Sequence, residues 1–143
     1  MINILSMIIS FISLWILGAF IHEIGHWLGA VLTGGSAKIK FWLYKGFIPS
    51  MKTYPEGTYN RPIFLYAGGS FTWLVYFIGM ILTDNCYIEY PLFVIALINL
   101  VYASYEMSYI DRWDIDKYMK YHYILYLICF IGFTGIYYVT KFT

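Results

Sequence analysis

The sequence predicts an all-α, multi-pass membrane protein with about four transmembrane helices. Of its 143 residues, 61% are hydrophobic and only 12% are charged, whereas about a quarter of the residues of a soluble domain are charged. Several apolar stretches are long enough to cross a bilayer core of about 30 Å. The length allows one small domain over residues 1–143. The lipid bilayer is therefore the expected environment of the whole chain.

Four apolar segments define the predicted spans. The first covers Ile4 to Leu32, and the glycine pair after it is a common helix stop. The second starts after Arg61-Pro62, because proline suits the first turn, and stays uncharged to Thr83. The third runs from Pro91 to about Ile110. The fourth covers about Tyr121 to Thr140, with tyrosines at both ends as expected for anchors at the membrane surface.

The segment between the first two spans has a different pattern. Polar and apolar residues alternate from Lys38 to Phe41, Lys45-Gly46 follows as a turn, and a second extended piece reaches Tyr54. This pattern predicts a small β-hairpin. An irregular loop at the membrane surface is the alternative, because Pro49 and Pro55 weaken the second strand.

The basic residues predict the orientation in the membrane. They gather between the first two spans and between the last two, and the middle connection has none. The positive-inside rule places both basic connections in the cytoplasm and both termini outside. A net charge of +1 argues against nucleic acid as a partner. Cys86 and Cys129 have no CxxC spacing, so neither a zinc knuckle nor a disulfide framework is expected.

One polar motif interrupts the first span. His22, Glu23 and His26 lie in the sequence HEIGH and are the only ionisable side chains from Met1 to Ala37. On a helix the two histidines share one face, which suits two imidazoles on one zinc ion, and Glu23 is a candidate general base. A charged side chain at membrane depth costs about 2 to 3 kcal/mol, so a functional role is favoured over a chance pattern.

A catalytic zinc ion takes three protein ligands and keeps one position open. The end of the third span and its exit supply the acidic candidates, Glu106, Asp111, Asp114 and Asp116. Those beyond Ile110 have an alternative role as a solvated charge cluster. Asn99 and Glu106 share one helix face, where they are expected to line a substrate groove or to bond between helices.

These features together resemble the site-2 protease family of intramembrane zinc metalloproteases. The resemblance covers roughly the first 115 residues: HEIGH within a membrane helix, a hairpin-like loop, Ala67-Gly68-Gly69 near the start of the next helix, and an acidic residue at the end of a third. In the family, the third ligand is the aspartate of a pattern that begins with asparagine and contains proline before Asp-Gly.

That pattern gives roles to two acidic residues. Glu106 and Asp114 have the family spacing, so the resemblance implies Asp114 as the third zinc ligand, with Asp111 as the alternative. Glu106 takes the place of the family asparagine and is expected to help position the substrate. Tyr109 and Ile115 stand where the family has proline and glycine, which alters how the helix presents Asp114.

The expected function is an intramembrane zinc metalloprotease that cleaves peptide bonds in or near transmembrane segments of other membrane proteins. Its site is expected near the cytoplasmic side, with the segment Ala37 to Tyr44 as a strand edge for an extended substrate. One alternative is a catalytically silent protein that keeps the zinc site and binds transmembrane partners. Metal transport ranks last, because the second and fourth spans carry no ladder of acidic or histidine residues. The expected site residues are Glu23 as base, His22, His26 and Asp114 as zinc ligands, and Asn99 and Glu106 as substrate contacts.

Overall fold

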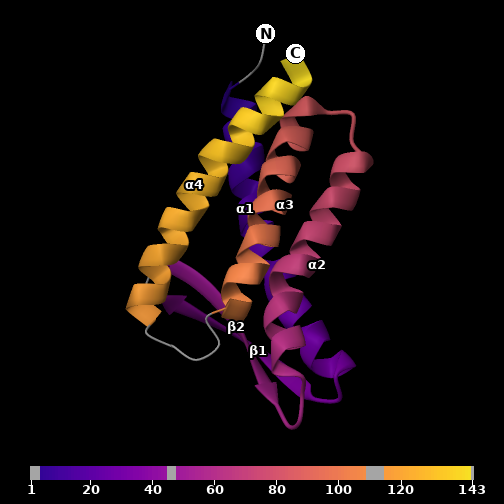
Figure 1. The fold of residues 1–143 in the computed structure, drawn as a ribbon, viewed down its shortest axis with the longest axis vertical. Helices are drawn as coiled ribbons and strands as arrows, with labels where there is room; N and C mark the ends of the chain where they lie inside the picture. The colour runs from indigo at the N-terminus through magenta and orange to yellow at the C-terminus, as the bar shows by residue number, and fades with distance from the viewer. Residues whose placement is uncertain (1–3, 45–47, 109–114, 143) are drawn as a thin grey trace.

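A computed structural model describes residues 4–44, 48–108 and 115–142. These residues form four helices and one antiparallel hairpin (Figure 1). In chain order the elements are α1 (Ile4–Leu32), β1 (Ser36–Tyr44), β2 (Ile48–Glu56), α2 (Arg61–Ile81), α3 (Cys86–Ser108) and α4 (Ile115–Phe142). The mostly helical fold and the hairpin between the first two helices are thus confirmed. The start of α1 and the end of α4 lie at the opposite end of the molecule from the hairpin (Figure 1).

Three of the described helices, α1, α2 and α3, are long and apolar enough to cross a membrane. The fourth helix, α4, has 28 residues, but the apolar stretch among its described residues is shorter and covers Ile124–Tyr137. The charged residues at its start belong to the helix.

The first two helices begin and end close to the predicted positions. At the end of α1, Gly34 has φ +92° and the N–H of Gly35 donates to the Ala30 carbonyl at 3.0 Å, which satisfies a carbonyl that the helix leaves open. At the start of α2, Asn60 Oδ1 accepts the N–H of Ile63 at 3.1 Å, with a proline in the first turn. α2 ends at Ile81, slightly before the predicted Thr83.

The predicted starts of the last two helices were wrong. α3 begins at Cys86 rather than Pro91, because Asn85 caps it: its Oδ1 accepts the N–H of Tyr87 at 3.0 Å. Pro91 therefore lies inside the helix. α4 begins at Ile115 rather than Tyr121, since lysine is a good helix former and lets the helix start before the apolar segment.

The hairpin register explains how β2 tolerates two prolines. Thr53 pairs with Ile39 but donates its N–H to Glu23 of α1, so this N–H points away from β1. Alternate residues of a strand share one edge, so Pro49 and Pro55 also turn their nitrogens to the outer edge. A missing N–H at these positions costs no bond within the hairpin.

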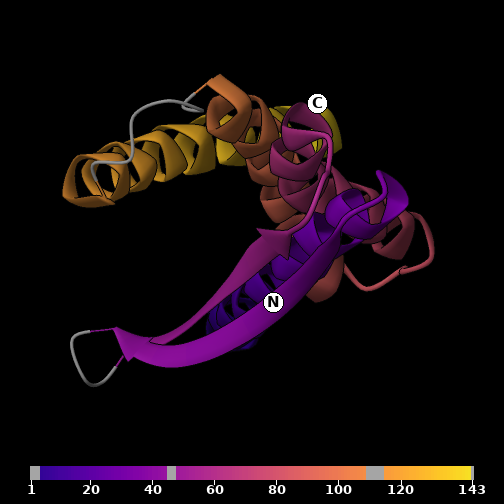
Figure 2. The ribbon, with the colours of Figure 1, turned by 90° about the horizontal axis from the view of Figure 1, so that it is seen from below.

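The helices pack with α3 in the centre and α1 on the outside. The side chains of Tyr90, Val94 and Ile95 in α3 are buried, whereas α1 exposes a series of large apolar side chains. α4 packs against α3 through Tyr137 and diverges from the other helices towards its own start (Figures 1 and 2). The exposed apolar surface of α1 is what a helix in contact with lipid would present.

Glycines set the distance between α1 and α2. A Cβ added to Gly25 would lie 2.5 Å from the Ala67 carbonyl oxygen, and one added to Gly29 would lie 3.1 Å from the Cα of Phe64. The two helix backbones are therefore in direct contact at these points. Small residues at such positions are typical of helices that pack within a membrane.

Candidate metal centre

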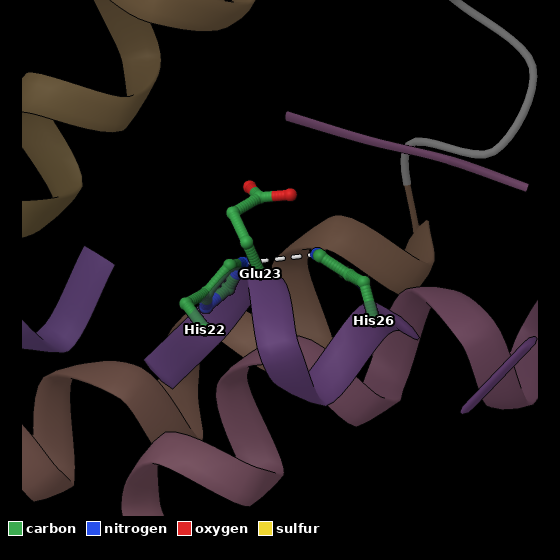
Figure 3. A group of neighbouring side chains, drawn as sticks. All are labelled: His22, Glu23 and His26. Carbon is green, nitrogen blue, oxygen red and sulfur yellow. Dashed lines mark hydrogen bonds between the residues drawn. The ribbon is translucent and has the colours of Figure 1, made fainter. Parts of the chain in front are cut away.

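Helix α1 places His22 and His26 side by side. Their Nε2 atoms are 3.0 Å apart, and their ring planes are nearly perpendicular, with centroids separated by 4.7 Å. The two residues are only 9% and 6% exposed. Figure 3 shows both rings on α1 with their Nε2 atoms facing each other. The i, i+4 spacing of the motif thus produces the paired imidazoles that the sequence predicted.

A carbonyl group of α2 fixes the orientation of His26. Its Nδ1 lies 2.7 Å from the main-chain oxygen of Phe64. An oxygen of this kind only accepts, so Nδ1 carries the proton and donates it. Neutral imidazole then leaves a lone pair on Nε2, towards His22. This is the usual arrangement of a histidine that binds a metal ion, in which the second ring nitrogen is held by a carbonyl or carboxylate.

Helix α3 adds a carboxylate to the pair. Glu106 Oε2 lies 3.2 Å from His22 Nε2 and 3.5 Å from His26 Nε2. Donor atoms about 2.0–2.1 Å from a tetrahedral zinc ion are about 3.3 Å from one another. The three separations, 3.0, 3.2 and 3.5 Å, all lie near that value. Two imidazoles and a carboxylate with this spacing fit a zinc ion in donor type and in distance.

The sequence had assigned Glu106 a different role. It was expected to contact substrate, with Asp114 as third ligand and Asp111 as the alternative. Both aspartates lie outside the described residues. Among the residues that the structure does describe, Glu106 is the carboxylate that contacts both ring nitrogens. The contact of Glu106 with the histidines was not predicted, because the family spacing pointed past Glu106 to Asp114.

The side chain of Asn99 is buried and bonded within its own helix. It is 4% exposed, and its amide Nδ2 donates to the carbonyl of Ile95 at 2.9 Å, within its own helix. Its main-chain oxygen faces α2 at Gly69. Contact between this side chain and a substrate remains a prediction.

Glu23 lies beside the histidines and is held by the hairpin. One carboxylate oxygen of Glu23 and one ring nitrogen from each of His22 and His26 all lie within 4.8 Å of one another. Glu23 Oε2 accepts the N–H of Thr53 at 2.5 Å, and Thr53 Oγ1 donates to the Glu23 carbonyl at 2.9 Å. In Figure 3 the carboxylate extends away from the paired rings.

The strand next to Glu23 is β2, not β1. The sequence had suggested the edge of Ala37 to Tyr44 for an extended substrate, whereas the edge that reaches Glu23 contains Thr53. Thr53 was missed because the hairpin pattern predicts strands but not which strand contacts the helix. The outward nitrogens at Pro49 and Pro55 carry no hydrogen, so Met51 and Thr53 are the donors between them on this edge.

The pKa of one lysine in the hairpin depends on the charges of the site. Lys52, next to Thr53, is half-buried; burial lowers its pKa, and the negative charges of Glu23 and Glu106 oppose that shift.

Aromatic rings line the other side of the histidines. The Tyr102 ring lies 5.5 Å from the His22 ring and 5.8 Å from the ring of Tyr126 in α4. The site thus lies between three helices and the hairpin.

Comparisons with models of protein families, with curated proteins and with solved structures found no match for this chain. The resemblance to the site-2 protease family therefore depends on the HEIGH motif and on the order of the elements around it. Membership of that family remains a prediction.

Proposed function

We propose that this protein is an integral membrane zinc metalloprotease that hydrolyses peptide bonds in or near transmembrane segments of other proteins. One observation supports this above the others: His22 Nε2, His26 Nε2 and Glu106 Oε2 converge with separations of 3.0 to 3.5 Å, and Glu23 lies beside them. In this proposal the third ligand is Glu106.

In this proposal three residues are metal ligands and a fourth is the general base. His22, His26 and Glu106 hold the ion through the three named atoms. Zinc supplies a Lewis acid that polarises a peptide carbonyl and acidifies water. Glu23 accepts the proton of the attacking water and passes it to the leaving amine. A carboxylate has about four acceptor positions, so Glu23 retains this capacity while Thr53 donates to Oε2.

Charge balance favours a doubly charged cation at this position. The carboxylates of Glu23 and Glu106 contribute two negative charges, and the histidines are neutral when they bind a metal ion. A zinc ion brings the total close to zero. A neutral cluster is much less costly to bury than two separate carboxylates, and Glu106 is mostly buried, with a side chain that is 13% exposed.

In this proposal the site lies towards the cytoplasmic side of the membrane. Glu106 lies near the end of α3 and Glu23 contacts Thr53 of β2, so the site lies beside the hairpin. This hairpin belongs to the basic connection between α1 and α2, which the positive-inside rule assigns to the cytoplasmic side. Water for hydrolysis then enters from that side, and the substrate enters from the bilayer.

A substrate helix must unwind before cleavage, because its carbonyls are bonded within the helix. The outer edge of β2 offers a partner for the unwound segment by strand addition. Between Pro49 and Pro55, the alternate residues Met51 and Thr53 present main-chain groups outward, and the N–H of Thr53 is already bonded to Glu23. The edge is therefore short and lies directly beside Glu23.

The test starts with metal content. We expect about one zinc per chain in detergent-purified protein, little change in Asp114→Asn, and loss in Glu106→Gln and in the double variant His22→Ala, His26→Ala. Zinc retained by Glu106→Gln but lost from Asp114→Asn would restore the assignment of Asp114. An absence of zinc in the wild type, after purification without chelators and with zinc supplied, would refute the metal site.

The second step tests catalysis with the wild type and Glu23→Gln. Cleavage of labelled transmembrane peptides in detergent is expected for the wild type, and Glu23→Gln should keep zinc but lose cleavage, because it cannot accept the proton. Zinc without cleavage in either protein would favour the alternative, a catalytically silent zinc-site protein that binds transmembrane partners.

A further inference from the structure

Gly68 of α2 lies directly against the paired histidines. A Cβ at this position would be 2.5 Å from His26 Nε2, 2.7 Å from His26 Cε1 and 2.8 Å from His22 Nε2. Ordinary van der Waals contact of a Cβ begins near 3.4 Å. A single methyl group would therefore overlap both of the nitrogen atoms that are proposed to bind zinc.

The other glycines of these helix interfaces have different neighbours. A Cβ on Gly25 would meet the carbonyl oxygen of Ala67 at 2.5 Å and the Cα of Gly68 at 2.9 Å. A Cβ on Gly69 would meet the carbonyl oxygen of Asn99 at 2.5 Å and the nitrogen of Ala103 at 2.8 Å. These neighbours are backbone atoms, which move only when a whole helix moves. The atoms that face Gly68 are the tips of two side chains, which can rotate.

The consequence for substitution follows from this difference. A methyl group at Gly25 or Gly69 pushes helices apart, because nothing local can give way. A methyl group at Gly68 turns the two imidazoles out of their present arrangement and leaves the helix backbones in place. The hydrogen bond from His26 Nδ1 to the Phe64 carbonyl is then also disturbed, and with it the direction of the Nε2 lone pair.

We propose that Gly68 is a positioning residue of the metal site: its missing side chain reserves the space in which His22 Nε2, His26 Nε2 and the metal ion meet. The proposal rests on the proposed zinc site. Its role differs from that of Gly25 and Gly69, which serve helix packing. The single methyl group that Gly68→Ala adds is enough to fill this space.

The experiment compares Gly68→Ala with Gly79→Ala in the same helix. A Cβ on Gly79 meets only Leu92, at 3.4 and 3.7 Å, so this variant is a matched control. The full-length proteins are purified in detergent, zinc per chain is measured, and Co²⁺ is titrated in as a spectroscopic probe of tetrahedral ligands. We expect Gly68→Ala to bind Zn²⁺ and Co²⁺ at least tenfold more weakly, and Gly79→Ala to match the wild type.

A second measurement separates the site from the fold without any metal. Thermal unfolding is recorded with a chelator present for Gly68→Ala, both alone and combined with His22→Ala and His26→Ala. If the methyl group clashes with the imidazoles, removal of both rings relieves the clash, and the substitution then changes the midpoint less than it does in the wild-type background. This comparison holds even if Gly68→Ala alone fails to fold.

The outcomes distinguish the two proposals. Weak metal binding by Gly68→Ala together with relief in the ring-free background supports the role of Gly68. Normal Co²⁺ spectra and zinc content in Gly68→Ala overturn this role and leave the zinc site intact. Equal destabilisation with and without the rings also overturns it, because Gly68 is then a packing residue like Gly25. A wild type that binds no zinc overturns the zinc site and the role of Gly68 together.

Discussion

At the level of the HEIGH motif, helix α1 is contacted on two sides by different kinds of structure. On one side, the backbone of α2 touches it at Gly25 and Gly29, and the Phe64 carbonyl holds His26. On the other side, a two-stranded hairpin reaches it through Thr53 and through the ring of Phe41, which lies 6.2 Å from that of Phe20. The first contact is between helix backbones; the second depends on a few side-chain and edge contacts.

The two kinds of contact correspond to two parts of the proposed chemistry, metal binding and proton transfer. Metal ligands must keep fixed distances, and they lie on helices that cannot move apart without loss of close packing. The proposed base, Glu23, must exchange protons and make room for a substrate, and it is held by a hairpin whose isolated stability is marginal. We infer a rigid side that holds the metal ion and an adjustable side that holds the base. The predictions below test this division.

The largest effect is expected where α1 and α2 touch. Gly25→Ala should lower the free energy of unfolding by about 3 kcal/mol, at the upper end of the usual cost of overpacking, because the new methyl group meets backbone atoms. Unfolding in detergent by heat or denaturant measures this change. Gly132→Ala in α4 is the control, since a Cβ there meets nothing within 4 Å. Equal stability of the two variants would contradict a rigid contact.

The second-largest change in stability is expected when zinc is removed from the site. At a free zinc concentration 100 times the Kd, bound metal stabilises the folded protein by about 2.7 kcal/mol. We expect a chelator to lower the unfolding midpoint of the wild type and to have no effect on Glu106→Gln. Midpoints are compared with zinc and with chelator for both proteins. A chelator effect of the same size in Glu106→Gln would exclude that carboxylate as a ligand.

A smaller effect is expected on the hairpin side. Thr53→Val removes the hydroxyl that donates to the Glu23 carbonyl but keeps the main-chain N–H. Loss of one such hydrogen bond costs about 1 kcal/mol. Zinc content should stay at the wild-type level, whereas the rate of peptide cleavage should fall, and Thr53→Ser should restore both stability and rate. Loss of zinc from Thr53→Val would show that the hairpin also positions the metal ligands.

The smallest effect is expected at the ion pair between Lys38 and Glu56. Their charged atoms lie 2.9 Å apart, but the side chains are 68% and 48% exposed. Exposed pairs of this kind contribute about 0.2–1 kcal/mol at most. Lys38→Gln should therefore change stability by less than about 0.5 kcal/mol and leave zinc content and cleavage unchanged. A large loss of cleavage would indicate that the strands at this position take part in substrate binding.

Local patterns in the sequence predicted much of the molecule because their causes are local. The start and end of α1 follow from its apolar run and the glycines after it, and the pairing of His22 with His26 follows from helix geometry. The hairpin strands follow from the alternation of polar and apolar residues, and the predicted turn at Lys45-Gly46 lies outside the described residues. The start of α3 was predicted wrongly because the prediction used Pro91 as the first residue and did not use Asn85 as the cap. Both residues are visible in the sequence.

What the sequence by itself determined is therefore the set of elements and the chemistry of one helix turn: two imidazoles on one face of α1 with a carboxylate beside them. Only the tertiary structure decided which distant groups complete that turn. Glu106 meets the histidines, and Thr53 meets Glu23, through the packing of elements far apart in the chain, with the distances between helices set by glycines such as Gly25 and Gly69. Contacts of this kind depend on the sum of many weak packing energies over the whole chain, and no single stretch of sequence encodes that sum.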